Sequence, residues 1–176
     1  MIESEFVQTI KLVEITVKDK NYYLEIADVR EIFVPERIVP IPLAERSIVG
    51  VTDIRGDLYT IISLEHRLYG NGVSSKLNSD SRFVLLEIKN EYFGILVDSI
   101  SSMREVPASI FQNRPAIVET EIEWDYIRSL GVLDGHSYII LDLESLIMPL
   151  GSEKQIKLIS DTSSIQKDIF LKNLKI

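Results

Sequence analysis

The sequence contains no cysteine among its 176 residues and only two histidines, His66 and His136. Without cysteine there can be no disulfide, thiolate nucleophile or thiolate metal site. Neither histidine belongs to a local metal-ligand motif such as His-Glu-x-x-His. Acidic residues are scattered at predicted turns and strand ends rather than paired, and Gly70-Asn71-Gly72 is not followed by the start of a helix. We therefore predict no catalytic residue, no cofactor and no metal.

Long apolar runs are also missing, and the first residues, Met1 to Glu5, lack the basic and apolar regions of a signal peptide. These absences predict a cytoplasmic protein without direct membrane insertion. The net charge is −8, although residues 151–176 hold five lysines against three acidic residues. Because an acidic body repels phosphate backbones, we expect protein partners and no nucleic acid.

The first half of the chain reads as strands with one helical segment. Apolar and polar residues alternate from Lys11 to Lys18, which indicates a half-buried strand, and Tyr22–Ile26 predicts its hairpin partner. Val29, Ile32 and Phe33 fall at helical spacing, so a short helix is predicted over 27–33.

The most apolar element is predicted at residues 47–64, two strands joined through Arg55-Gly56-Asp57, since Gly-Asp is typical of a hairpin turn. After a small, polar connection the pattern recurs: strands are predicted at 83–88 and 92–97, and residues 135–144 repeat the pattern of residues 56–65. Asp98, just past a strand, is predicted to cap a helix. This repeat predicts that the chain contains two copies of one β-rich unit.

We predict an all-β fold of two packed SH3-like five-stranded β-barrels related by internal duplication, with short helices and a C-terminal helix. The predicted divisions are a first lobe, a flexible connection, a second lobe and a C-terminal tail, at residues 7–69, 70–81, 82–150 and 151–176. The prediction leaves open that the N-terminal strand crosses between lobes. One irregular β-sandwich is the alternative.

Several short motifs resemble the CheW family of chemotaxis adaptors. The family pattern Asn-Leu-Arg-Gly between two apolar strands is matched by Asp53-Ile54-Arg55-Gly56, and the resemblance extends over residues 7–148. Asp53, Thr60 and Ser63 depart from the residues that are common there. The other matches follow in the same order along the chain: Val29-Arg30-Glu31-Ile32, Ile41-Pro42, Gly94-Ile95-Leu96-Val97-Asp98 and Ile140-Leu141-Asp142-Leu143.

This resemblance implies a non-catalytic scaffold. Family members bind the cytoplasmic signalling tip of chemoreceptors and the regulatory domain of the chemotaxis histidine kinase, and the resemblance implies the same partners here. It also implies recruitment to membrane-associated receptor arrays. Two alternatives remain: an acidic β-barrel enzyme with a small substrate between the lobes, and a CheW-like scaffold of another sensory pathway.

The candidate partner-binding residues lie on the predicted helix and the apolar strands. Arg55 is predicted to pair with Glu31, and the pair to shape a surface that partners contact. Apolar side chains are predicted to line a groove between the lobes, and Trp124 is either a surface anchor or a lid on the second lobe. The full candidate set is Val29, Glu31, Ile32, Phe33, Ile54, Arg55, Gly56 and Val97.

Overall fold

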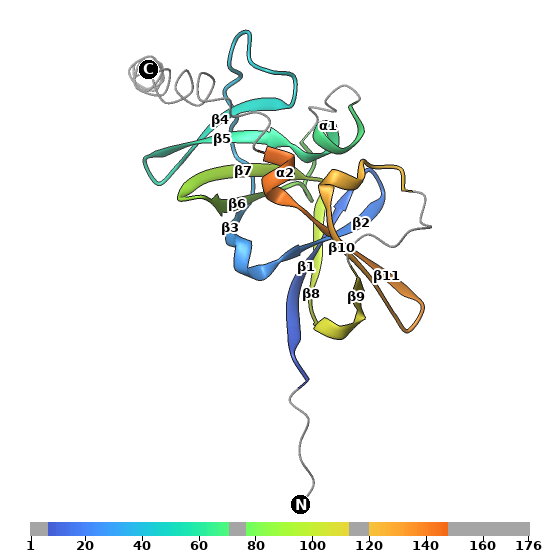
Figure 1. The fold of residues 1–176 in the computed structure, drawn as a ribbon. Helices are drawn as coiled ribbons and strands as arrows, with labels where there is room; N and C mark the ends of the chain where they lie inside the picture. Colours follow the sequence, from blue (N-terminus) through green and yellow to red (C-terminus); the bar gives the residue numbers. More distant parts are fainter. Residues whose placement is uncertain (1–6, 71–76, 113–119, 148–176) are drawn as a thin grey trace, which may run out of the picture.

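The computed structural model describes residues 7–70, 77–112 and 120–147. These residues form two β-sheets with short helices at their junctions (Figure 1). Sheet A has the order β8-β1-β2-β11-β10-β9, and sheet B has the order β3-β6-β7-β5-β4. The all-β, two-lobe prediction is confirmed. Sheet A carries one strand beyond the five expected, the two-residue β9.

The strands of sheet A are β1 (Thr9–Val17), β2 (Lys20–Glu25), β8 (Ser99–Pro107), β9 (Phe111–Gln112), β10 (Ile127–Leu133) and β11 (His136–Leu141). Those of sheet B are β3 (Val29–Phe33), β4 (Ile48–Ile54), β5 (Asp57–Ser63), β6 (Arg82–Ile88) and β7 (Glu91–Val97). The α-helices are α1 (Leu64–Tyr69) and α2 (Leu143–Ile147), and the 3-10 helices are η1 (Ile26–Asp28), η2 (Ala108–Ile110) and η3 (Trp124–Tyr126).

The two sheets exchange their first hairpins. The β1–β2 hairpin inserts between β8 and β11 in sheet A, and the β6–β7 hairpin inserts between β3 and β5 in sheet B. Both insertions use a parallel pairing, Ile140 with Tyr23 in sheet A and Ile61 with Gly94 in sheet B. The sheets therefore do not follow the predicted division into residues 7–69 and 82–150, because each takes strands from both halves of the chain.

The largest core cluster is shared by the two sheets. Sheet A contributes Val13, Ile15 and Val17 of β1, and sheet B contributes buried residues of β5, β6 and β7. A second, smaller cluster covers the other face of sheet A around Leu12, Tyr23 and Ile140. Since the first cluster draws on both sheets, its burial holds the lobes against each other.

The helix predicted over residues 27–33 is wrong. Only η1 is helical, and Val29 to Phe33 form the edge strand β3, which pairs with β6. A bulge between Val29 and Glu31 breaks the regular alternation, which explains why apolar residues recur there at a spacing that resembles a helix.

Asp98 does not cap a helix, because β8 follows it directly. Its Oδ2 instead accepts a hydrogen bond of 2.7 Å from the backbone N–H of Lys18. Trp124 lies in η3 and is half-buried. The predicted C-terminal helix lies outside the described residues.

Candidate protein-binding surface

The predicted hairpin is present, with β4 and β5 joined at Arg55 and Gly56. Both turn residues have positive φ angles, 56° and 92°. The tight two-residue connection requires this geometry, and glycine adopts it without steric cost. The Gly56 N–H donates to Asp53 Oδ1 at 3.0 Å. A side-chain oxygen of asparagine can accept the same bond, so Asp53 preserves the turn despite departing from the family pattern.

Arg55 pairs with Glu31, as predicted. Its Nη2 donates to Glu31 Oε1 at 2.7 Å and its Nη1 donates to Oε2 at 3.3 Å. Glu31 belongs to β3, while Arg55 directly follows β4, and these are the two outer strands of sheet B. The ion pair therefore links the two edges of the sheet.

The Arg55 side chain is nevertheless open to solvent, with 75% of its surface exposed against 39% for Glu31. Its guanidinium carbon lies 5.9 Å from the centre of the Phe33 ring, within the range of a cation–π contact. Because the ion pair already orients the Arg55 guanidinium, this group can bind a partner's carboxylate with little further loss of conformational entropy.

Two tyrosines lie near the ion pair. The rings of Tyr59 and Tyr92 meet edge to face, with centres 6.4 Å apart, and Tyr92 is half exposed. Burial and then the negative charge of Asp57 raise the pKa of the Tyr59 hydroxyl. The shift moves ionisation further from neutral pH, where a tyrosine hydroxyl is already protonated and able to donate a hydrogen bond. Sequence reasoning missed both tyrosines, because they stand on different strands that only the hairpin exchange brings together.

The candidate residues divide between surface and core. Ile32 is 41% exposed, and Phe33 and Ile54 are partly exposed. Val97 is 1% exposed and belongs to the shared core, and the partly buried Val29 packs against that core. The name Arg55 surface is used below for the six candidates that remain accessible: Glu31, Ile32, Phe33, Ile54, Arg55 and Gly56.

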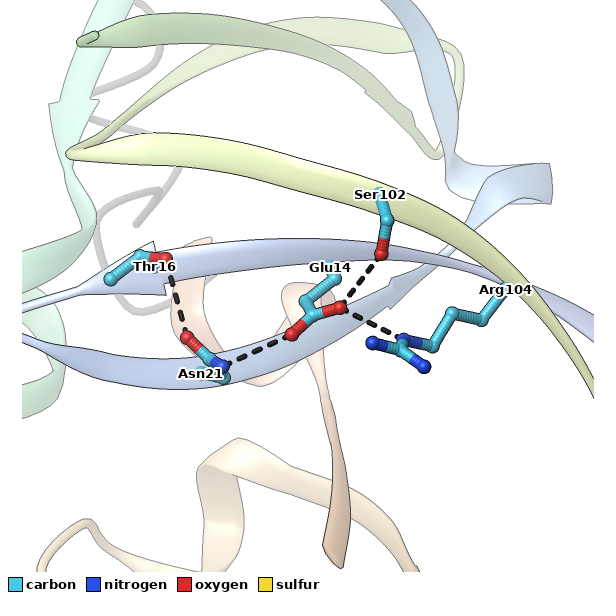
Figure 2. Close-up of polar contacts among 5 residues, drawn as sticks. All are labelled: Glu14, Thr16, Asn21, Ser102 and Arg104. Carbon is cyan, nitrogen blue, oxygen red and sulfur yellow. Dashed lines mark hydrogen bonds and ion pairs between the residues drawn. The ribbon is translucent and has the colours of Figure 1, made fainter. Parts of the chain in front are cut away.

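A second polar cluster lies in sheet A, around Glu14 of β1 (Figure 2). The Glu14 residue is only 5% exposed, although it stands at a polar position of the alternating pattern. Its Oε1 accepts from Asn21 Nδ2 at 3.0 Å, and its Oε2 accepts from Ser102 Oγ at 2.8 Å and Arg104 Nε at 2.9 Å. The carboxylate thus connects β1 to β8 and to the start of β2.

Two opposing effects act on the pKa of Glu14. Burial raises it, but the hydrogen bonds from Arg104 and Ser102 favour the ionised form and lower it by more. The net shift is downward, so the carboxylate is ionised at neutral pH. Fully hydrogen-bonded in this way, Glu14 has a structural role in the sheet.

The α1 helix begins and ends with standard capping geometry. The Ser63 hydroxyl accepts from the His66 N–H at 3.2 Å, and Gly70 adopts the left-handed conformation with a φ of 67°. Serine and aspartate are both good N-caps, which explains how Ser63 can stand where the family commonly has aspartate.

A cavity of about 600 Å³ lies beside α1, where the helix faces η3. Its lining is mainly polar, and the residues that line it include Glu45, His66, Arg67, Glu121 and Glu123. None of the candidate residues lines it, so this cavity differs from the apolar groove that the sequence predicted between the lobes.

The described part of the chain contains no group of three or more histidine, aspartate or glutamate side chains arranged to hold a metal ion. No helix of the described ranges is long and apolar enough to cross a membrane.

Comparison with known proteins points to one family. The model of the CheW-like domain matches residues 11–149. The chemotaxis protein CheW of Treponema pallidum is 28% identical over 139 residues, which cover 77% of this chain and 81% of that protein. The chemotaxis protein CheW of Klebsiella aerogenes is 27% identical, with coverage of 75% and 78%.

The fold agrees with that of a solved relative. The crystal structure of the scaffolding protein TtCheW from Thermoanaerobacter tengcongensis superposes with a TM-score of 0.71 at 23% identity, covering 84% of this chain and 93% of that one. The family match, which spans most of the chain including the Arg55 hairpin, shows that the protein belongs to the CheW-like domain family.

Proposed function

We propose that this protein is a non-catalytic adaptor that binds the cytoplasmic signalling tip of chemoreceptors and the regulatory domain of the chemotaxis histidine kinase. The same proposal puts it in the cytoplasm, recruited to membrane-associated receptor arrays. Its mechanism is geometric: two lobes held by a shared core fix the distance between the partners, so that movement of the receptor changes the conformation of the kinase.

The observation that carries the proposal is the Arg55 surface. An ion pair presents an exposed guanidinium next to the aromatic ring of Phe33. Protein interfaces commonly combine an arginine anchor with aromatic and aliphatic contacts. A receptor helix with one apolar face and a carboxylate at its margin is complementary to this arrangement.

Co-sedimentation tests the proposal directly. Receptor signalling fragments assembled on vesicles should retain the kinase in the pellet only when this protein is added. The variant R55A should reduce that retention, whereas R82A, an arginine that bonds backbone carbonyls at the start of β6, should not. Failure of the wild-type protein to pellet with either partner would refute the adaptor role.

A scaffold of a different sensory pathway uses the same fold and the same type of surface. The identity of the partner distinguishes this scaffold from a chemotaxis adaptor. Capture of a receptor or kinase from a pathway other than chemotaxis would favour the scaffold of that pathway. Both are non-catalytic roles, unlike the enzyme that the sequence left as an alternative.

A further inference from the structure

The segment that carries one side of the Arg55 surface has no fully buried side chain. Residues 25–46, all of which the structure describes, are exposed or partly exposed throughout, and they include η1 and β3. In the described part of the chain β3 pairs only with β6, and a bulge interrupts that pairing. Because apolar burial contributes little to holding this segment, its polar contacts help to decide where Glu31 and Phe33 lie.

Arg128 of β10 holds the beginning of this segment. Its Nη1 donates to Glu25 Oε1, at the end of β2, and to Asp28 Oδ2, in η1, each at 3.0 Å. The Arg128 side chain is 34% exposed and each carboxylate side chain is 29% exposed, so water screens these pairs less than it screens a fully exposed pair. Burial lowers the pKa of Arg128, but the hydrogen bonds and charges of the two carboxylates raise it by more, so the guanidinium stays charged.

Arg128 occupies an irregular position on its strand. The register of β10 against β11 shifts between Ile127 and Ser129, which makes Arg128 the extra residue of a β-bulge. The repeat that relates residues 135–144 to residues 56–65 also relates Arg128 to Val49, and Val49 is the extra residue of a bulge in β4. Since the fold forms this bulge with valine in the first repeat, the bulge does not require an arginine. The contacts of Arg128 with Glu25 and Asp28 are therefore an addition specific to the second repeat.

We propose that Arg128 is a positioning residue for the Arg55 surface. It ties η1 to sheet A, η1 leads directly into β3, and Glu31 follows Asp28 by three positions. Glu31 orients the guanidinium of Arg55, which also lies near the ring of Phe33, so a displaced β3 would present that charge differently to a partner. The inference rests on the proposed role of the Arg55 surface, but its structural part can be tested without a partner.

Hydrogen exchange of the whole, partner-free protein tests the structural part. R128V introduces the residue that occupies the equivalent bulge, and it should speed backbone amide exchange in residues 26–33 about tenfold. R128K should exchange nearly as slowly as the wild type, because a single nitrogen makes both contacts and an ammonium group can donate to both carboxylates. K20M breaks the ion pair with Glu121 at the other end of β2, and it should leave exchange in residues 26–33 unchanged.

Partner binding tests the functional part. In the receptor or kinase co-sedimentation that R55A weakens, R128V should reduce affinity about threefold to tenfold, and R128K should restore most of the loss. In the R55A background R128V should cause little further loss, because both changes act through the same guanidinium. A purely structural role of Arg128 would instead reduce affinity by the same factor in both backgrounds.

Unchanged exchange over residues 26–33 in R128V would overturn the proposal, as would equal losses of affinity in the wild-type and R55A backgrounds. Should R128V fail to fold in a thermal scan, D28A decides in its place, because it removes the acceptor in η1 and should speed exchange over the same residues. Normal binding by the wild type that R128V leaves unchanged would refute this inference alone. A wild-type protein that binds neither partner would refute the adaptor role, whereas faster exchange in R128V would still support Arg128 as the residue that anchors η1 and β3.

Discussion

Arg55 donates to both carboxylate oxygens of Glu31 across the open edge of sheet B, while three quarters of its own side chain remains exposed. An exposed ion pair contributes little to folding, typically about 0.2–1 kcal/mol. The pair is therefore better explained by the orientation it gives the guanidinium than by its contribution to stability.

The first prediction separates these two roles. R55A should lower the free energy of unfolding by less than about 1 kcal/mol, measured by urea denaturation, and should weaken receptor or kinase binding about tenfold. R55K retains the charge but loses the two-pronged contact, so its affinity should fall between wild type and R55A. A stable R55A protein with unchanged affinity for both partners would remove Arg55 from the site.

The second prediction concerns Glu14 and pH. A carboxyl group whose pKa is lower in the folded state stabilises the protein above its unfolded pKa, and this contribution is lost as pH falls through the folded value. E14Q should therefore reduce stability at pH 7 by about 1–3 kcal/mol. The difference from wild type should shrink as the pH falls below 4.5, the ordinary pKa of glutamate.

Chemical denaturation of wild type and E14Q across this pH range provides the measurement. E91Q serves as the control, since Glu91 is exposed and its loss should change stability little. A constant difference between wild type and E14Q from pH 7 to pH 3 would contradict the role given to the ionised carboxylate.

The third prediction compares two glycines of the hairpin. At Gly50 the φ angle is 154°, and a Cβ would lie 2.3 Å from the carbonyl oxygen of Val39. At Gly56 the φ angle is 92°, but nothing lies within 4 Å of the added atom. G50A should therefore destabilise the protein by about 3 kcal/mol or more, and G56A by about 1–2 kcal/mol. Thermal unfolding of both variants tests this order, and a G50A protein as stable as G56A would contradict it.

Much of the fold could be predicted from local patterns. Alternation between Lys11 and Lys18 indicated β1, and the Gly-Asp turn at residue 56 indicated the β4–β5 hairpin, because both signals depend on neighbouring residues. The Arg55–Glu31 pair could also be predicted, since a guanidinium beside an apolar hairpin is expected either to pair within the chain or to bind a partner's carboxylate, and Glu31 is a candidate within the chain.

Strand partners and side-chain environments could not be obtained in the same way. Alternation shows that a strand has two faces, but it does not show which strand lies beside it, so the exchange of the β1–β2 and β6–β7 hairpins left no local signal. For the same reason, alternation alone does not show that Glu14 is buried. Its burial depends on Ser102 and Arg104, which are 88 and 90 residues away. The bulge in β3 gave a misleading helical spacing.

The last prediction follows from the exchange of hairpins. If each sheet needs strands from both halves of the chain, a fragment of residues 1–75 lacks the β6–β7 hairpin between β3 and β5, and a fragment of residues 76–176 lacks β1 and β2 between β8 and β11. Each fragment also exposes its share of the core that Val13, Ile15 and Ile95 form in the whole chain. We expect both fragments to be unfolded or aggregated alone, because unpaired inner strand edges and exposed apolar surface are unfavourable. Circular dichroism and NMR of each fragment, followed by mixing, would show whether native structure returns only when the two are combined. A first fragment that gives dispersed NMR signals alone would instead support the predicted independent lobe of residues 7–69.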